Sequence, residues 1–428
     1  MKKIIVMLLT TVAIVQNGNA QNLVNGELRN LMLQSLSNFS KVKEVQQSVQ
    51  LAEDRLKLVE LNQYPDVTLD ASYAYVKPKI EVAFGDKTFQ FAPEHNVSAA
   101  VNANYTLFDF GRLKANIEKS KKELQTAHHV AEQLKVSLFT QISQVYFQVV
   151  FAKKAIQIQD QVLQLLNENK SILEAQLKNG NAIQLDVLTI QSKIDNENNK
   201  KIDLETNLQK LLNLLNYATG INTVKEGTLQ ISLKKYTLEE AIQMAVQHNP
   251  TYAVAKDKVE VSKSEVAISK LGEKPYVGLK ASMGSRNGYL PAINDPRFNY
   301  NAGIGFSLPL FNGGKTKQQI KIQEHNLSLS ETNVSSLLSE LEKDITAAMI
   351  DIESNEKRIK NAATQIEQAA LAQKLSVSKL KNGTATPLEI TSTNSDYQRA
   401  LLNQLQYQYQ LCNAQLELIK LTGINLID

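Results

Sequence analysis

Few residues of this chain have the types and spacing that catalysis requires. Asp109-Phe110-Gly111 spells the magnesium-binding motif of protein kinases, but neither a glycine-rich loop nor a catalytic loop accompanies it. Gly303 and Gly305 lack the third glycine and the helix start of a dinucleotide site. There is also no Gly-x-Ser-x-Gly motif and no cysteine–histidine pairing. We therefore expect neither enzymatic activity nor a cofactor.

The histidines and the cysteine give no metal site either. His128 and His129 are adjacent in a helical pattern, so their side chains diverge by about 100°, and the other three histidines are scattered. Cys412 is the only cysteine, which excludes an intrachain disulfide. Its helical spacing near the C-terminus predicts a small buried side chain.

Two acidic residues stand just after sharp turns. Thr386-Pro387-Leu388-Glu389 has the composition of a helix capping box with proline at the first helical position, and Asp186 occupies the equivalent place after an earlier turn. An acid at a helix start stabilises the helix whatever else it does, because the helix dipole is positive there. A structural role is thus one interpretation of both residues.

The elements that position these residues occur twice. Three landmarks recur at an offset of 203 positions: Phe-x-x-Gly at 108–111 and 311–314, Leu-Lys-Asn-Gly at 177–180 and 380–383, and Thr-Gly-Ile-Asn at 219–222 and 422–425. One constant offset over more than 100 residues indicates a tandem duplication of residues 96–222 as 299–425. We divide the chain into a leader at 1–20, a first repeat at 21–222, a linker at 223–236 and a second repeat at 237–428.

Each repeat contains two segments in which apolar and polar residues alternate. The alternation predicts strands with one apolar and one polar face at 67–75, 97–107, 277–283 and 300–308. Each is about ten residues long, the length of a tilted membrane-spanning strand. Four strands cannot close a barrel, which needs about eight or more, and an open edge in lipid leaves backbone groups unpaired. Either the strands form a soluble sheet, or several chains share one barrel, and three chains would give twelve strands.

Long helices follow the strands. Residues 111–177 and 314–380 predict helices of about 100 Å each with coiled-coil seams. Gly180 and Gly383 fit the left-handed position just after a helix, and the chain then returns as helices over 184–217 and 387–421. Shorter helices are predicted over 22–63 and 237–272, the latter interrupted at Pro250. The predicted fold is mainly helical with a β part.

The leader and the charge balance bear on the compartment. Residues 1–20 have a basic start, an apolar run of about 12 residues and small residues before Gln21, which is typical of a secretory signal peptide. The net charge is +4 from 47 basic and 43 acidic residues, and no basic cluster favours a nucleic-acid partner. The leader therefore predicts an exported protein.

In the linker, the residues from Leu229 to Leu233 form a short run that resembles a strand.

The duplication, the strand pairs that end in Leu107-Phe108-Asp109-Phe110-Gly111 and Leu310-Phe311-Asn312-Gly313-Gly314, and the Leu-Lys-Asn-Gly turns resemble those of the TolC family of outer-membrane efflux and secretion channels. His248-Asn249-Pro250 and the closing Thr-Gly pairs are similar as well. The resemblance covers essentially the whole chain after the leader.

The resemblance implies a homotrimer in the outer membrane of a Gram-negative bacterium. Three protomers would share one twelve-stranded transmembrane barrel and a periplasmic tunnel of coiled-coil helices. The channel would dock an inner-membrane pump through a periplasmic adaptor and export drugs, metals or polypeptides. One strand face would contact lipid, and the opposite face would line water with Asp70, Asn102, Asn104 and Lys280.

The resemblance also assigns roles to the turns after the long helices. In the family these tips contact the adaptor and close the periplasmic end. The corresponding residues here are Lys178, Asn179, Gly180, Asn181, Lys381, Asn382, Gly383 and Thr384. Asp186 and Glu389 would then form a gate of acids around the axis, beside their interpretation as helix caps. Ala385 and Ser392 stand where the best-known channel of the family has charged gate residues, so an identical gate is not expected.

An alternative of a different class stays open at this point. A secreted coiled-coil scaffold or adhesin, with its hairpins in a soluble β domain, has the same pattern of strands and helices. Fractionation separates the two hypotheses, because the scaffold would stay in the aqueous periplasm without detergent.

Overall fold

The computed structural model describes residues 23–225 and 227–427. The predicted signal peptide, 1–20, lies outside the described residues. The chain divides into two compact units, and each takes part of both repeats. The helical unit comprises 23–42, Leu134–Asn249 and 341–427, and the sheet unit comprises Lys43–Gln133 and Pro250–Glu340. The boundaries between the units therefore differ from those between the repeats.

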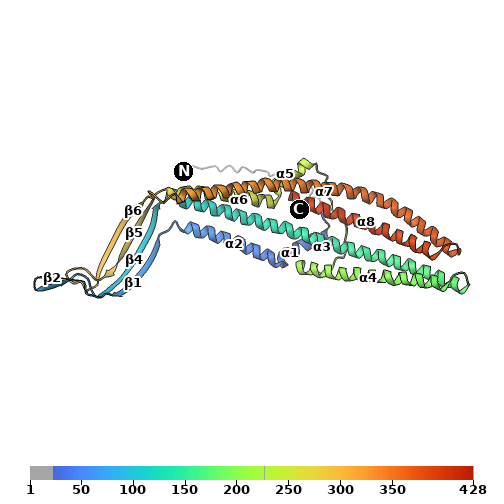
Figure 1. Ribbon diagram of the computed structural model, residues 1–428, viewed down its shortest axis with the longest axis horizontal. Helices are drawn as coiled ribbons and strands as arrows, with labels where there is room; N and C mark the ends of the chain where they lie inside the picture. The colour runs from blue at the N-terminus through green and yellow to red at the C-terminus, as the bar shows by residue number, and fades with distance from the viewer. Residues whose placement is uncertain (1–22, 226, 428) are drawn as a thin grey trace, which may run out of the picture. The chain divides into compact units, whose positions relative to one another are not determined.

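The order of elements matches the predicted order, with long helices followed by shorter returning ones (Figure 1). The helices are α1 Gly26–Asn38, α2 Ser40–Leu61, α3 Arg112–Lys178, α4 Gln184–Thr219, α5 Leu238–His248, α6 Pro250–Lys270, α7 Lys315–Lys381 and α8 Pro387–Thr422, with a 3-10 turn at Leu271–Glu273. The strands are β1 Asp66–Tyr75, β2 Glu81–Phe84, β3 Lys87–Gln90, β4 His95–Phe108, β5 Tyr276–Arg286 and β6 Arg297–Ser307. None of the described helices combines the length and the apolar character that crossing a membrane requires.

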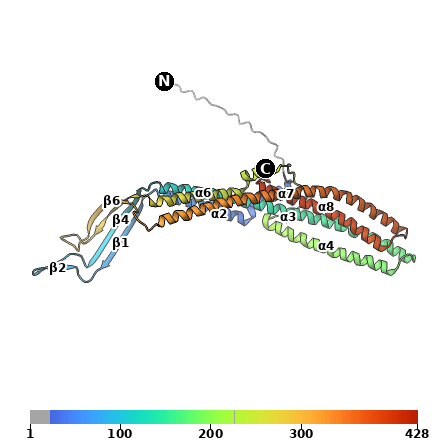
Figure 2. The same cartoon turned by 45° about the horizontal axis from the view of Figure 1, so that its top comes forward.

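The predictions for the long helices are confirmed. Both α3 and α7 have 67 residues, which corresponds to about 100 Å at 1.5 Å per residue. Gly180 and Gly383 have φ of 74° and 69°, the left-handed conformation that ends each helix. In the helical unit, Figures 1 and 2 show α4 beside α3 and α8 beside α7 as two hairpins.

The core of the helical unit consists of seams between these hairpins. One apolar cluster lies near the turns and includes Leu166, Leu173, Ile190, Leu380 and Ile390. A larger cluster lies where α1, α3, α4 and α8 meet. Its fully buried members include Leu28, Met32, Ile142, Tyr146, Phe147, Leu215 and Leu416. Cys412 belongs to this second cluster, as its spacing predicts, and burial raises the pKa of its thiol to about 12.

The predicted continuous helix over 22–63 is wrong in one respect, because it is broken at Phe39. The break coincides with a contact that local sequence does not reveal. The Asn38 side chain donates a hydrogen bond to the Thr219 carbonyl at the end of α4, 2.7 Å away. The second repeat has the corresponding joint, in which Asn249 donates to the Leu421 carbonyl at 2.9 Å and Pro250 begins α6.

Two loops also differ from expectation. The polar stretch between β1 and β4 contains an additional hairpin, β2–β3, in which Val82 opposes Phe89. The strand-like run from Leu229 to Leu233 is not a strand. It makes one backbone hydrogen bond, from the Ser232 N–H to the Leu23 carbonyl at 2.9 Å, and no strand lies beside it in the described chain.

The main sheet has the order β1-β4-β5-β6, with every pair antiparallel. The strand pairs of the two repeats therefore meet at β4 and β5, and β1 and β6 are the outer strands. Because the strands are antiparallel, the end of β4, the start of β5 and the end of β6 lie at the same end of the sheet. The long helices α3 and α7 begin at this end.

Candidate functional site

The register places the four predicted lumen residues on one face of the sheet. Asn102 lies opposite Thr68 and Ser282, and Asn104 lies opposite Lys280. Asp70 is two residues from Thr68 on β1, so it lies on the same face. The Asn102 amide donates to the Asp70 carboxylate at 2.6 Å, and the Thr68 hydroxyl donates to the same oxygen at 3.0 Å. This face carries mainly polar or small residues on all four strands.

The opposite face is apolar and largely exposed in the single chain. Leu69, Tyr300 and Ile304 are 74%, 78% and 71% exposed. A register shift between Thr106 and Phe108 brings Phe108 opposite Val277, so the phenyl ring of Phe108 lies at the end of the apolar face. A water-soluble sheet would cover such a face with other elements, whereas lipid would cover it without them.

The first tip ends α3 with a tight turn. The Asn181 N–H donates to the Gln176 carbonyl at 2.8 Å across Gly180, which is the hydrogen bond expected of a glycine helix terminus. The Asp186 carboxylate then accepts the Ile183 N–H at 3.1 Å. Asp186 therefore supplies one half of a capping box, and Ile183 has no side-chain oxygen for the other half.

The second tip is built differently. The Thr384 N–H donates to the Lys379 carbonyl at 2.9 Å, and the Thr386 hydroxyl accepts the Glu389 N–H at 3.2 Å. The Glu389 carboxylate does not return to the cap. It pairs instead with the Lys379 ammonium at 3.0 Å. The two acids occupy equivalent positions in the repeats but have different partners.

The two tips lie side by side in the helical unit. The Gln176 amide donates to the Leu380 carbonyl at 2.5 Å, and Leu380 is fully buried in the apolar cluster near the turns. All eight predicted tip residues are exposed. Near them, Ile183, Leu185, Leu188 and Leu388 present large apolar side chains, which are 56–76% exposed. The exposed tip surface is thus partly apolar.

Sequence reasoning missed a buried polar cluster in the same unit. Glu197 of α4 has no exposed surface, and its carboxylate accepts from Gln159 of α3 at 2.8 Å and Gln398 of α8 at 3.1 Å. Lys193 and Lys200 pair with its other oxygen at 3.0 and 2.8 Å. Burial opposes ionisation, but the hydrogen bonds from Lys200, Gln159, Gln398 and Lys193 outweigh it and lower the pKa of Glu197 to about 2.

A signal for this cluster was present in the sequence. Val187, Ile190, Ile194 and Glu197 follow the 3,4,3 spacing of a helix seam, so a charged residue occupies a position where the pattern demands an apolar one. A buried carboxylate is stable only when opposite charges and hydrogen-bond donors compensate it. The partners come from three helices, which one sequence cannot bring together.

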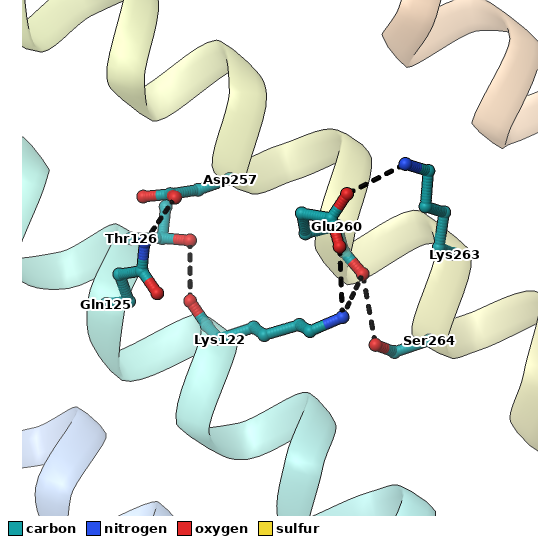
Figure 3. Close-up of polar contacts among 7 residues, drawn as sticks. All are labelled: Lys122, Gln125, Thr126, Asp257, Glu260, Lys263 and Ser264. Carbon is teal, nitrogen blue, oxygen red and sulfur yellow. Dashed lines mark hydrogen bonds and ion pairs between the residues drawn. The ribbon is translucent and has the colours of Figure 1, made fainter.

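In the sheet unit, polar pairs join α3 to α6 (Figure 3). Lys122 bonds to Glu260 at 3.2 Å, and the Gln125 amide donates to Asp257 at 2.9 Å. Lys263 also pairs with Glu260, at 2.8 Å. The nearest feature to a histidine site is the contact of His129 Nδ1 with Asp257 at 2.5 Å. No group of three or more possible metal ligands occurs among the described residues.

The kinase-like motif has a structural explanation. The Asp109 carboxylate accepts the N–H groups of Gly111 and Leu113, which caps the start of α3. Phe110 and Gly111 have φ of 55° and 90°, the left-handed region, at the turn that leads from β4 into the helix.

Comparisons with known proteins give one consistent result. Residues 31–221 and 241–424 match the model of the protein family described as outer membrane efflux protein. Among curated proteins, the cation efflux system protein CusC of Escherichia coli O157:H7 is 20% identical over 338 residues, which cover 76% of this chain and 70% of CusC. The pyoverdine export outer membrane protein OpmQ of Pseudomonas putida is 20% identical over 76% of this chain and 70% of its own length.

Among solved structures, a membrane protein from Pseudomonas aeruginosa superimposes with a TM-score of 0.83 at 14% identity, covering 94% of this chain and 91% of that protein. At this identity the likeness concerns the fold. The order of strands and helices described above is therefore shared with a known membrane protein.

Proposed function

Because the chain belongs to the outer membrane efflux protein family, we propose that three copies close one twelve-stranded barrel across the outer membrane above a helical periplasmic tunnel. As a member of this family, the protein is an outer-membrane efflux channel and not an enzyme. A periplasmic adaptor and an inner-membrane pump are its partners. What is proposed is the geometry of the duct and the roles of individual residues.

The four-stranded sheet carries the proposal. It has one polar and one exposed apolar face, and its outer strands β1 and β6 have no further strand beside them in the described chain. Such a sheet in lipid needs its edges paired, and bacterial barrels need about eight strands or more. Pairing β6 of one copy with β1 of the next closes the barrel at twelve strands with three chains.

The two faces then have distinct environments. Outer-membrane lipid would contact the face of Leu69, Tyr300 and Ile304. The opposite face would line the lumen with Asp70, Asn102, Asn104 and Lys280, which carry charges of both signs. A lumen of mixed charge does not select cations or anions strongly. The pump would therefore decide which small molecules, metals or polypeptides enter.

The tips are the proposed docking surface for the adaptor. Their polar turn residues, 178–181 and 381–384, are exposed, and apolar side chains such as Leu185 and Leu388 flank them at 65% and 76% exposure. An apolar centre with a polar rim is the usual anatomy of a protein interface.

Asp186 and Glu389 are the proposed gate residues. Three copies of each acid near the axis would attract cations and would hold the closed tips in place. The contacts support different contributions: Asp186 caps α4, whereas Glu389 pairs with Lys379. Since the ion pair is exposed, it contributes about 0–1 kcal/mol to stability, which leaves the Glu389 carboxylate available for another partner.

Conductance of the reconstituted channel tests both levels of the proposal. Covalently crosslinkable trimers and single-channel currents in planar bilayers are expected, and their absence would refute the duct. If the acids form the gate, Asp186→Ala with Glu389→Ala raises the basal conductance. Lys379→Gln is the matched control, because it removes the ion pair and keeps the acid. A loss of stability with unchanged conductance in the double variant would leave only the capping role.

A further inference from the structure

Basic residues outnumber acidic ones at the end of the sheet where the strands lead into the helices α3 and α7. The segments 60–66, 105–117, 270–276 and 308–321 meet at this end of the sheet and carry seven basic side chains against four acidic ones, Glu60, Asp66, Asp109 and Glu273. Asp109 is occupied in capping α3. Neither α3 nor α7 has an acidic residue in its first turn, where helices usually favour one.

Of the seven cations only Lys270 has an ion-pair partner among the described residues, and four of the other six are lysines in the turns nearest the strands. We call them the junction lysines: Lys114, Lys274, Lys315 and Lys317. All four are exposed. Farther along α3 the lysines are paired, Lys119 with Glu265 at 3.0 Å. Lys122 pairs with Glu260 at 3.2 Å, as Figure 3 shows.

Exposed apolar side chains lie immediately beside the junction lysines in the chain. Leu310 and Phe311, just before α7, are 89% and 91% exposed. Phe108 and Phe110, just before α3, are 56% and 42% exposed, and their rings meet edge to face at 4.6 Å. Rings followed within one or two turns by basic residues are the composition of a membrane–water interface.

We propose that this junction binds the headgroups of anionic phospholipids in the periplasmic leaflet of the outer membrane. The inference rests on the proposed function, in which the strands span that membrane and the helices enter the periplasm. The apolar strand face continues into the exposed rings, which reach the level of the headgroups. The junction lysines then face the phosphate diesters, which are anionic partners for their ammonium groups.

The magnitude follows from the electrostatics of such surfaces. Each lysine near an anionic bilayer surface increases association about fivefold, and the effect decreases within a Debye length of about 10 Å at moderate salt. Four lysines in each chain should therefore give a measurable preference for anionic over zwitterionic lipid. The preference should weaken as the ionic strength rises.

The test uses the full-length mature channel in phosphatidylcholine vesicles that contain traces of spin-labelled phosphatidylglycerol or phosphatidylcholine. Electron paramagnetic resonance gives the fraction of each lipid that the protein immobilises. The native channel is expected to immobilise phosphatidylglycerol several-fold more. Replacing the four junction lysines by glutamine should bring the ratio close to one.

A matched control removes the same charge elsewhere. Lys210, Lys258, Lys360 and Lys374 are exposed, lie on helices away from the strands and have no ion-pair partner among the described residues. Their replacement by glutamine should leave the lipid preference unchanged. An equal loss in this control, or a preference that survives in the junction variant, would overturn the inference.

Two further outcomes are decisive. If the vesicles show channel conductance but no preference for phosphatidylglycerol, the inference fails and the proposed duct stands. If trimers and conductance are absent, the proposed function fails first. Unchanged lipid preference together with weakened adaptor binding in the junction variant would assign the lysines to an acidic protein partner and would overturn the lipid assignment.

Discussion

Glu197 is the residue on which the packing of three helices converges. Its charge is retained inside the protein because two glutamines and two lysines donate to it. Breaking such an arrangement by removing one partner is strongly destabilising, since a buried charge loses its compensation. The cluster thereby joins α3, α4 and α8 through side-chain hydrogen bonds at one height.

The pH dependence of stability tests this interpretation. The folded-state pKa of Glu197 is lowered from 4.5 to about 2, so its contribution is fully present above pH 4.5 and is lost as the pH falls toward 2. The shift corresponds to about 3 kcal/mol. We expect the melting temperature of the detergent-solubilised trimer, followed by circular dichroism, to fall over this range.

Glu197→Gln should melt at a lower temperature at pH 7 and should show a smaller additional loss in acid. Glu367→Gln, an exposed position on α7, serves as the control and should follow the native curve. Identical pH profiles for native protein and Glu197→Gln would contradict a stabilising role for the charge.

At this scale the sequence predicts where residues stand but not what they touch. The parity of Asp70, Asn102, Asn104 and Lys280 follows from the alternation, and the sheet register confirms that they share a face. The different partners of Asp186 and Glu389 were not predictable. Lys379 reaches Glu389 only because the turn brings the end of α7 back beside the start of α8.

Among the elements, the helix ends have consequences for mutation. Gly180 and Gly423 both have left-handed φ, of 74° and 72°. A Cβ at Gly180 would point into open space, but at Gly423 it would lie 2.3 Å from the His248 carbonyl oxygen. The second glycine therefore serves both the helix end and the joint with α5.

We expect Gly180→Ala to cost about 1–2 kcal/mol from backbone strain alone. Gly423→Ala should cost clearly more, because the joint with the α5–α6 break must also move. Thermal unfolding and trimer yield of the two variants give the comparison. Equal losses would show that the joint has little energetic weight.

The strands allow a second comparison at this scale. Arginine at Val101 would face lipid near the middle of β4, whereas arginine at Asn102 would face the lumen beside Asp70. A lipid-facing arginine costs about 2–4 kcal/mol at mid-bilayer. We expect Val101→Arg to fold poorly into vesicles and Asn102→Arg to fold like the native protein, as measured by protection from protease. If Asn102→Arg folded poorly and Val101→Arg folded like the native protein, the assignment of the lipid-facing and lumen-facing sides would be reversed.

The positions of the elements were largely predictable from sequence. The predicted long helices, 111–177 and 314–380, differ by one residue from α3 and α7, because glycine and the change of period are local signals. The break at Phe39 was missed, since it coincides with a contact between Asn38 and Thr219 that local sequence does not reveal, and no proline marks it. Leu229–Leu233 was misassigned because a strand requires a partner as well as a pattern.

For the whole molecule, the unpaired outer strands lead to the last prediction. In a Cys412→Ser background, a cysteine on the apolar face of β6, such as Ile304→Cys, should form a disulfide with a cysteine on β1 of a neighbouring copy. A scan of β1 positions 67, 69, 71 and 73 should give crosslinked trimers at one register. The readout is the molecular mass in non-reducing gels, with each single cysteine as its control. No crosslink at any position would contradict a shared barrel.

The two tips of each chain are not interchangeable, because one acid caps a helix and the other pairs with a lysine. A ring of three chains would display six tips in strict alternation, so its true symmetry would be threefold and only approximately sixfold. An adaptor that meets this ring therefore encounters two classes of site. Adaptor molecules should bind in two sets of three, and the affinities of the two sets should differ.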